Sequence, residues 1–179
     1  SPLTVMQLAS EMGRVYDIEK LTLFRACECY EELEAAGKLD ADALIFVNSI
    51  ASVSLSDEDW ASYCEAHSAI LPKLVVEITE EEEMNEQELE RKRNVPGATG
   101  VFALDDYGSG YSNGNSLLTV APKYVKVDIA IIRGIDTDAD KQQFLMTLID
   151  YAHPRGVQVL AEGVETLSEL RKVLEMGVD

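Results

Sequence analysis

Five short apolar runs, each about the length of a β-strand, constrain the fold of this chain most strongly. They are continuously apolar rather than alternating, which is typical of parallel strands covered on both faces. Stretches with helical spacing separate them. The runs cover residues 43–47, 74–76, 100–104, 124–125 and 157–161. This alternation predicts an α/β fold with a parallel sheet, either a barrel or a doubly wound sheet.

Two helices are predicted before the first strand. Ser1 can cap the first, in which Val5, Leu8, Ala9 and Met12 recur at helical spacing until Gly13. Asp17 is the expected cap of the second, which Gly37 ends. The expected buried stripe of this second helix is Leu23, Ala26, Cys27 and Tyr30.

Capping-box patterns mark three further helix starts, at 56–59, 137–140 and 166–169. The core stripe predicted for the helix that begins near residue 138 is Leu145, Leu148, Ile149 and Ala152.

A polar residue stands at the end of each predicted strand. These residues are Asn48, Glu77, Asp105 with Asp106, Lys126 with Asp128, and Glu162. Singly, such an Asn is commonly a turn former, an Asp a helix cap and a Lys a solvated charge. Five in a row favour a barrel, because the C-terminal ends of barrel strands meet at one mouth, where the active sites of such enzymes lie.

Four clustered carboxylates need positive charge among them, because like charges a few ångströms apart cannot all ionise. Oxygen ligands without His or Cys favour Mg²⁺, Mn²⁺ or Ca²⁺ over zinc. The adjacent Asp105 and Asp106 could serve two ions. Two such ions would polarise a phosphodiester and activate water, and Lys126 could orient that water or neutralise developing charge.

Composition narrows the classes of partner. The 179 residues carry a formal net charge of -18, which argues against nucleic-acid polymers and anionic membranes. The length suits one domain, and no apolar stretch is long enough to span a membrane.

Three cysteines without a disulfide framework suggest a reducing, cytoplasmic setting, with any membrane anchor in other domains. The glutamates of 77–90, apart from Glu77 and Glu80, read as a solvated helix start, and His67 and His153 as surface or helix-end residues.

The motifs at these positions resemble the EAL family of cyclic di-GMP phosphodiesterases. Residues 46–48 resemble its Asn strand, and 76–80 resemble its Glu-x-Thr-Glu strand. Residues 104–111 resemble its Asp-Asp-Phe-Gly-Thr-Gly-Tyr loop, with Tyr for Phe and Ser for Thr. Residues 125–128 resemble its Lys-Ile-Asp strand, and 161–166 match Ala-Glu-Gly-Val-Glu-Thr unchanged.

The resemblance implies roles for the strand-end residues. The implied metal ligands are Asn48, Glu77, Asp105, Asp106 and Glu162. It implies that Lys126 contacts the attacking water and that Glu162 serves the second metal or activates water. The residues implied to support the site are Glu80, Gly108, Gly110, Asp128 and Glu165. In the family, Glu80 would anchor the loop that carries the two glycines and couples metal binding to dimerisation.

By this resemblance the chain is one EAL-type TIM-like (β/α) barrel domain over 1–179, with five of eight strands; the first two strands and the last are expected outside it. It implies metal-dependent hydrolysis of cyclic di-GMP to pGpG with two Mg²⁺ or Mn²⁺ ions, Ca²⁺ being inhibitory. It also implies a homodimer and an upstream GGDEF or sensor domain. Such a clipped chain is expected to associate through its open edges and to turn over poorly.

Two alternatives remain open at this point. The first is an inactive EAL domain that binds cyclic di-GMP or a protein partner without turnover. The second is an unrelated metal-dependent barrel enzyme that acts on a small carboxylate, which would have no reason to carry the loop at 105–110.

Overall fold

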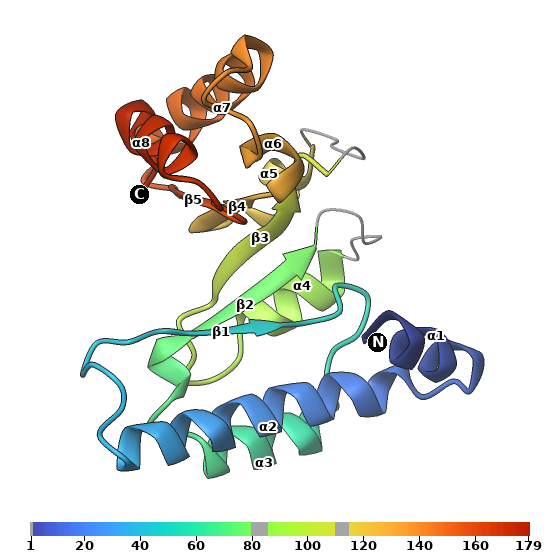
Figure 1. The fold of residues 1–179 in the computed structure, drawn as a ribbon. Coiled ribbons are helices and arrows are strands. Elements are labelled where there is room, and N and C mark those ends of the chain that lie inside the picture. The colour runs from blue at the N-terminus through green and yellow to red at the C-terminus, as the bar shows by residue number, and fades with distance from the viewer. Residues whose placement is uncertain (1, 80–85, 110–114) are drawn as a thin grey trace. The chain divides into compact units, whose positions relative to one another are not determined.

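The computed structural model describes residues 2–79, 86–109 and 115–179, which form two compact units (Figure 1). The first comprises Ser1–Ile78 and Glu82–Val101, and the second comprises Thr79–Glu81 and Phe102–Asp179. All five predicted strands are present, and the strand pairs within each unit are parallel, as predicted.

The first unit places helices against a parallel strand pair. Its elements are α1 (Pro2–Glu11), α2 (Val15–Ala35), β1 (Ile45–Asn48), α3 (Asp57–Ala66), a 3-10 turn (Leu71–Lys73), β2 (Leu74–Thr79) and α4 (Glu86–Arg93). α2 packs on β1 and also contacts α1 (Figure 1).

Helix α2 starts earlier than predicted. The residue before its first turn is Arg14, so Asp17 is not the cap but lies inside the first turn. There its carboxylate accepts a hydrogen bond from Arg14 at 2.7 Å, and a negative charge near a helix N-terminus is favourable.

The buried face of α2 differs from the predicted stripe at two positions. Leu23, Cys27 and Tyr30 are buried as predicted, while Ala26 is only partly buried. Glu19, one turn before Leu23, is also buried and extends the same face.

An aromatic cluster fills the core between α2 and α3. Tyr63 is fully buried, with its ring edge-to-face against Phe24 and Trp60, and its hydroxyl lies 3.0 Å from the Cys27 sulfur. His67 follows α3, as predicted for a helix end, but it is buried rather than on the surface because it packs against Tyr63. In α1 only Ala9 of the predicted stripe is buried, and the exposed members are Val5, Leu8 and Met12.

The second unit is a three-stranded parallel sheet with helices between its strands. Its elements are β3 (Val101–Tyr107), α5 (Asn115–Val120), β4 (Tyr124–Val127), α6 (Ile129–Ile132), α7 (Ala139–Ala152), a 3-10 turn (His153–Arg155), β5 (Gln158–Ala161) and α8 (Leu167–Met176). β4 lies between β3 and β5, and α7 packs against α6 and β5. All four predicted core residues of α7 are buried, whereas His153 is exposed at a helix end as predicted.

Of the three predicted capping boxes, two begin at the residue that caps the helix, while the predicted cap Ser1 lies outside the described residues. Ser56 accepts a hydrogen bond from the Asp59 N–H, and Thr166 forms a complete capping box with Glu169. The cap of α7 is Asp138 rather than Thr137, because the Asp138 carboxylate reaches the N–H groups of the first turn. The prediction was therefore wrong by one residue.

Glu169 joins three segments of the second unit. Its buried carboxylate accepts hydrogen bonds from the backbone N–H groups of Gly134, Glu165 and Thr166 at 2.8, 3.1 and 2.9 Å. These backbone hydrogen bonds, chiefly the one from Gly134, lower the pKa of Glu169 from 4.5 to about 2.

Because the folded-state pKa is depressed, the stability that Glu169 contributes is present above about pH 4.5 and is lost as pH falls towards 2. We expect Glu169→Gln to lower the melting temperature at pH 7, and the difference from wild type to shrink as pH falls from 4.5 to 2. Thermal melts at pH 7, 5, 4, 3 and 2 measure this. Parallel curves for the two proteins over this range would contradict the assignment.

In the described part of the chain, no helix combines the length and apolar character needed to cross a membrane. Cys27, Cys29 and Cys64 are free thiols.

Candidate metal centre

A β-bulge places two acids opposite one lysine. The register between β3 and β4 shifts between Leu104 and Tyr107. Asp105 and Asp106 of β3 therefore lie opposite the single residue Lys126 of β4. These acids are inside β3 rather than after its end, as Glu77 is inside β2, so the predicted strand ends were too early.

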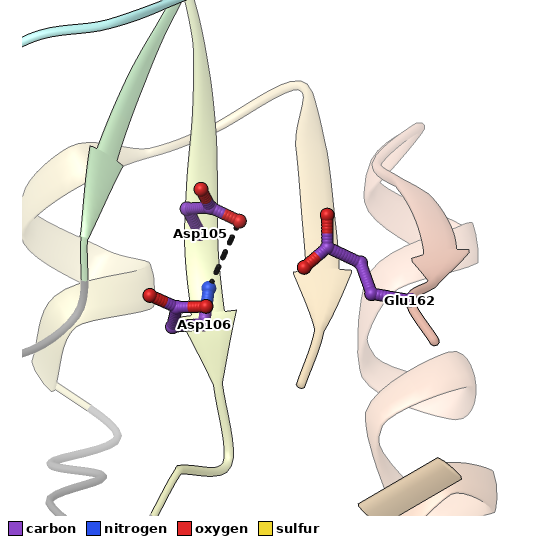
Figure 2. A group of neighbouring side chains, drawn as sticks. All are labelled: Asp105, Asp106 and Glu162. Carbon is purple, nitrogen blue, oxygen red and sulfur yellow. Dashed lines mark hydrogen bonds between the residues drawn. The ribbon is translucent and has the colours of Figure 1, made fainter. Parts of the chain in front are cut away.

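The bulge explains how adjacent acids can share one site. Successive residues of a regular strand point to opposite faces, so two neighbouring aspartates would normally diverge. Asp106 has φ of 54°, a left-handed conformation uncommon outside glycine. Its N–H donates to the Asp105 carboxylate at 3.1 Å, the interaction dashed in Figure 2. The backbone distortion is thus compensated by the acid beside it.

Glu162 completes a group of three carboxylates. Its N–H donates to the Val127 carbonyl at 3.1 Å, which continues the β4–β5 ladder one residue beyond β5. One carboxylate oxygen from each of Asp105, Asp106 and Glu162 lies within 4.8 Å of the others (Figure 2). The structure therefore brings together three of the residues predicted as metal ligands.

Lys126 lies between two of these acids. Its ammonium is 2.9 Å from Asp105 and 2.8 Å from Glu162. The lysine side chain is only 17% exposed, so these ion pairs are less screened than surface pairs. One lysine charge therefore faces three carboxylates.

The excess of negative charge in this group affects the pKa of Asp106. Burial raises the pKa of Asp106 above its usual value, and the neighbouring charges of Asp105, Asp128 and Glu162 raise it further, while Lys126 partly opposes them. A divalent cation would relieve this repulsion. The oxygen-only donor set fits Mg²⁺, Mn²⁺ or Ca²⁺, whose ligand bonds of about 2.0–2.6 Å allow ligand oxygens up to about 5 Å apart. The residues present thus fit the ions that the motifs implied.

The residues predicted to support the site have separate structural tasks. Asp128 caps α6 by accepting the Ala130 N–H at 2.7 Å. The Glu165 side chain pairs with Arg133 on the surface. Gly108 has φ of +95°, and a Cβ there would lie 2.8 Å from the Ile131 side chain. Glu80 and Gly110 lie outside the described residues.

Gly163 holds the turn directly after Glu162. Its φ is +65°, and a Cβ there would lie 2.5 Å from Ile129, so both backbone and packing require glycine. We expect Gly163→Ala to displace Glu162 and to weaken Mn²⁺ binding and turnover about 10-fold or more, the effect of disturbing groups that orient a ligand. Titration with Mn²⁺ and a turnover assay measure this.

Ile129 offers a control for this prediction, because its side chain is the obstacle. Ile129→Ala combined with Gly163→Ala should recover part of the loss, and Ile129→Ala alone should change little. Equal Mn²⁺ affinity in wild type and Gly163→Ala would show that this turn does not determine where Glu162 lies.

Asn48 and Glu77 are neighbours in the first unit. They are register partners at the ends of β1 and β2, and parallel partners carry their side chains on the same face. Glu77 is buried and Asn48 is exposed. The Glu77 carbonyl also accepts the Ser49 N–H at 2.9 Å, which extends the pairing by one residue.

The family model described as the EAL domain matches residues 1–179. The chain belongs to the EAL domain family. A curated relative, the probable cyclic di-GMP phosphodiesterase PdeG of Escherichia coli K12, is 27% identical over 175 residues. That match covers 95% of this chain and 34% of the relative, so the chain spans about a third of that relative's length.

The fold of this EAL domain is similar to those of solved structures. The PaMucR phosphodiesterase in complex with c-di-GMP matches with a TM-score of 0.81 and 23% identity, over 100% of this chain and 74% of that one. The manganese and cy-diGMP complex of Klebsiella pneumoniae BlrP1 matches with a TM-score of 0.76 and 22% identity, over 92% and 43%. The fold is the EAL type of TIM-like barrel, incomplete in this chain, which confirms the predicted fold class.

Two features of this EAL domain were missed in the sequence. One is the bulge at Asp105 and Asp106, which depends on the register between β3 and β4 and has no local signal in the sequence. The other is the buried pair of Glu19 and Lys92. Glu19 could have been noticed, because it continues the apolar spacing of α2, but nothing in the sequence indicates a partner 73 residues away.

Proposed function

We propose that this EAL domain hydrolyses cyclic di-GMP to linear pGpG with divalent metal ions. The observation that carries the proposal is the group of Asp105, Asp106 and Glu162 within 4.8 Å, with Lys126 paired to two of them. The curated relative's name and the c-di-GMP complexes among the similar structures support the same substrate.

Asp105, Asp106 and Glu162 would hold Mg²⁺ or Mn²⁺. Bound divalent cations supply charge stabilisation for a phosphodiester and a more acidic water. Two ions are proposed, because the bulge presents two separate aspartates rather than one. Ca²⁺ would compete for the same oxygens as an inhibitor, since it prefers more ligands and longer bonds.

The chain's own residues would perform distinct tasks. The Lys126 ammonium would orient the attacking water and balance negative charge that develops on the phosphate oxygens. Glu162, whose side chain is 35% exposed, would accept a proton from that water or hold a second ion. The bulge and the ion pairs hold these groups in place before substrate binds.

The remaining ligand assignments rest on the family resemblance. Asn48 and Glu77 would be further metal ligands. Glu80 would anchor the loop that carries Gly108 and Gly110. Asp128 and Glu165 would support the site through the helix cap and the surface pair that they form.

The proposal extends to the protein's setting. We propose a homodimer, an upstream GGDEF or sensor domain and a cytoplasmic location, with strands outside this chain completing the barrel. The family resemblance supports the homodimer, the upstream domain and the completed barrel. The three free cysteines support the cytoplasmic location. Light scattering of the full-length protein tests the dimer.

A turnover assay tests the function. Full-length protein is incubated with cyclic di-GMP and Mg²⁺ or Mn²⁺, with Ca²⁺ and metal-free arms, and the products are separated chromatographically. The proposal expects pGpG with Mg²⁺ or Mn²⁺ and little in the other two arms. Saturable binding without product would instead indicate the inactive receptor alternative.

A further inference from the structure

A buried ion pair lies in the first unit, close to the end of β1. Lys92 of α4 pairs with Glu19 of α2, and both side chains are 1% exposed. The Lys92 ammonium also donates to the Ser49 hydroxyl at 2.6 Å, and that hydroxyl donates to Glu19. The second oxygen of Glu19 accepts the Ile50 N–H at 2.8 Å. The Glu19–Lys92 network thus joins two helices to residues 49 and 50.

Stability alone is a weak reason for such a pair. Removing two charges from water is costly, and buried ion pairs can often be replaced by apolar residues of similar size without loss of stability. Glu19 lies on the face of α2 that also buries Leu23 and Cys27, so a leucine there would continue the apolar stripe. The buried Glu19–Lys92 pair is therefore expected to have a role other than stabilising the packing of the two helices.

The network acts on the backbone directly after Asn48. Ser49 is held through its hydroxyl by both charged residues, and its N–H is bound to the Glu77 carbonyl at 2.9 Å. Ile50 is held through its own N–H. The chain is thus fixed at both residues after Asn48 and tied to the strand that carries Glu77.

We propose that Glu19 and Lys92 are positioning residues that fix the backbone at Ser49 and Ile50, and through it orient Asn48 beside Glu77 for a divalent metal ion. The inference rests on the proposed function, because that function assigns Asn48 and Glu77 as metal ligands. Groups that orient metal ligands contribute about 10–100-fold to metal affinity. That magnitude is expected here.

Two double variants separate positioning from stability. Glu19→Leu with Lys92→Met removes both charges and the acceptor for the Ile50 N–H. Glu19→Gln with Lys92→Met also removes both charges but keeps an amide oxygen as acceptor. Lys20→Met is the matched control, since it breaks the 2.7 Å pair of the next residue in α2 with Asp59 and leaves Ser49 untouched.

Three readouts are taken on the full-length protein: the melting temperature, hydrogen exchange of the Ile50 amide, and Mn²⁺ affinity by titration. We expect the Leu/Met variant to melt near the wild-type temperature, to exchange the Ile50 amide faster and to bind Mn²⁺ about 10–100-fold more weakly. The Gln/Met variant should recover part of the Ile50 amide protection and part of the Mn²⁺ affinity. Lys20→Met should match wild type in both of these quantities.

The outcomes distinguish the two proposals. If wild type binds no Mn²⁺ and hydrolyses no cyclic di-GMP, the proposed function fails and the positioning role fails with it. If wild type binds Mn²⁺ and the Leu/Met variant binds it equally well, the positioning role alone is overturned. The positioning role is also overturned if the Leu/Met variant binds Mn²⁺ more weakly only because it melts at a lower temperature, and the Gln/Met variant does not restore the binding.

Discussion

Lys126→Ala is expected to lower kcat for cyclic di-GMP by about 10²-fold or more while changing KM little, the effect of removing one preorganised electrostatic group. The ammonium is paired with Asp105 and Glu162 at 2.9 and 2.8 Å, so it is already in place before charge develops. Its loss therefore affects the reaction more than the binding of substrate.

The measurement needs a metal titration, because removing a cation from among carboxylates can also strengthen metal binding. Steady-state kinetics of the full-length protein at saturating Mn²⁺ remove this effect, and single-turnover measurements isolate the chemical step. Lys123→Ala is the control, since Lys123 lies just before β4 and donates to the Gly156 carbonyl instead. An unchanged kcat in Lys126→Ala would contradict the assignment.

Asp106→Asn is expected to weaken Mn²⁺ binding by about 10²-fold or more and yet to raise the melting temperature of the metal-free protein at pH 7. Loss of a ligand should exceed the effect of losing a group that only orients one. The stability gain follows from the raised pKa of Asp106, because burial and the neighbouring acids disfavour its charged form in the folded protein.

The sign follows from linkage. With a raised folded-state pKa, the stability contributed by Asp106 is present at low pH and is lost as pH rises through that pKa, so at pH 7 the charged group is destabilising. Asparagine removes that penalty. Asp150→Asn, on the exposed face of α7, is the matched control and should change neither quantity. A lower melting temperature with unchanged Mn²⁺ affinity in Asp106→Asn would show that the residue is structural.

Much of the fold could be predicted from the sequence because local patterns decide it. The five apolar runs became five strands, and Leu145 with its helical neighbours became the buried face of α7. Errors arose where neighbouring residues compete for one task. Thr137 and Asp138 can both cap α7, and the carboxylate, which reaches two N–H groups, is the one used.

The site was harder to predict because it depends on pairing between distant segments. The residue types of Asp105, Asp106 and Glu162 indicated metal chemistry, but no local pattern contains the register shift that brings the first two together. Burial of Glu19 was missed for the same reason, since a charged residue is predicted to be exposed unless its partner is known.

The bulge in β3 has a consequence for insertions and deletions. Two residues between Leu104 and Tyr107 face one residue of β4, so the segment is one residue longer than its partner. Deleting either aspartate would restore regular alternation and leave one acid at the centre instead of two. Substituting that aspartate would change its chemistry but keep Tyr107 in phase with β4. Homologous chains that present two adjacent acids in this way must therefore keep the number of residues here, even where the residues beside the acids change.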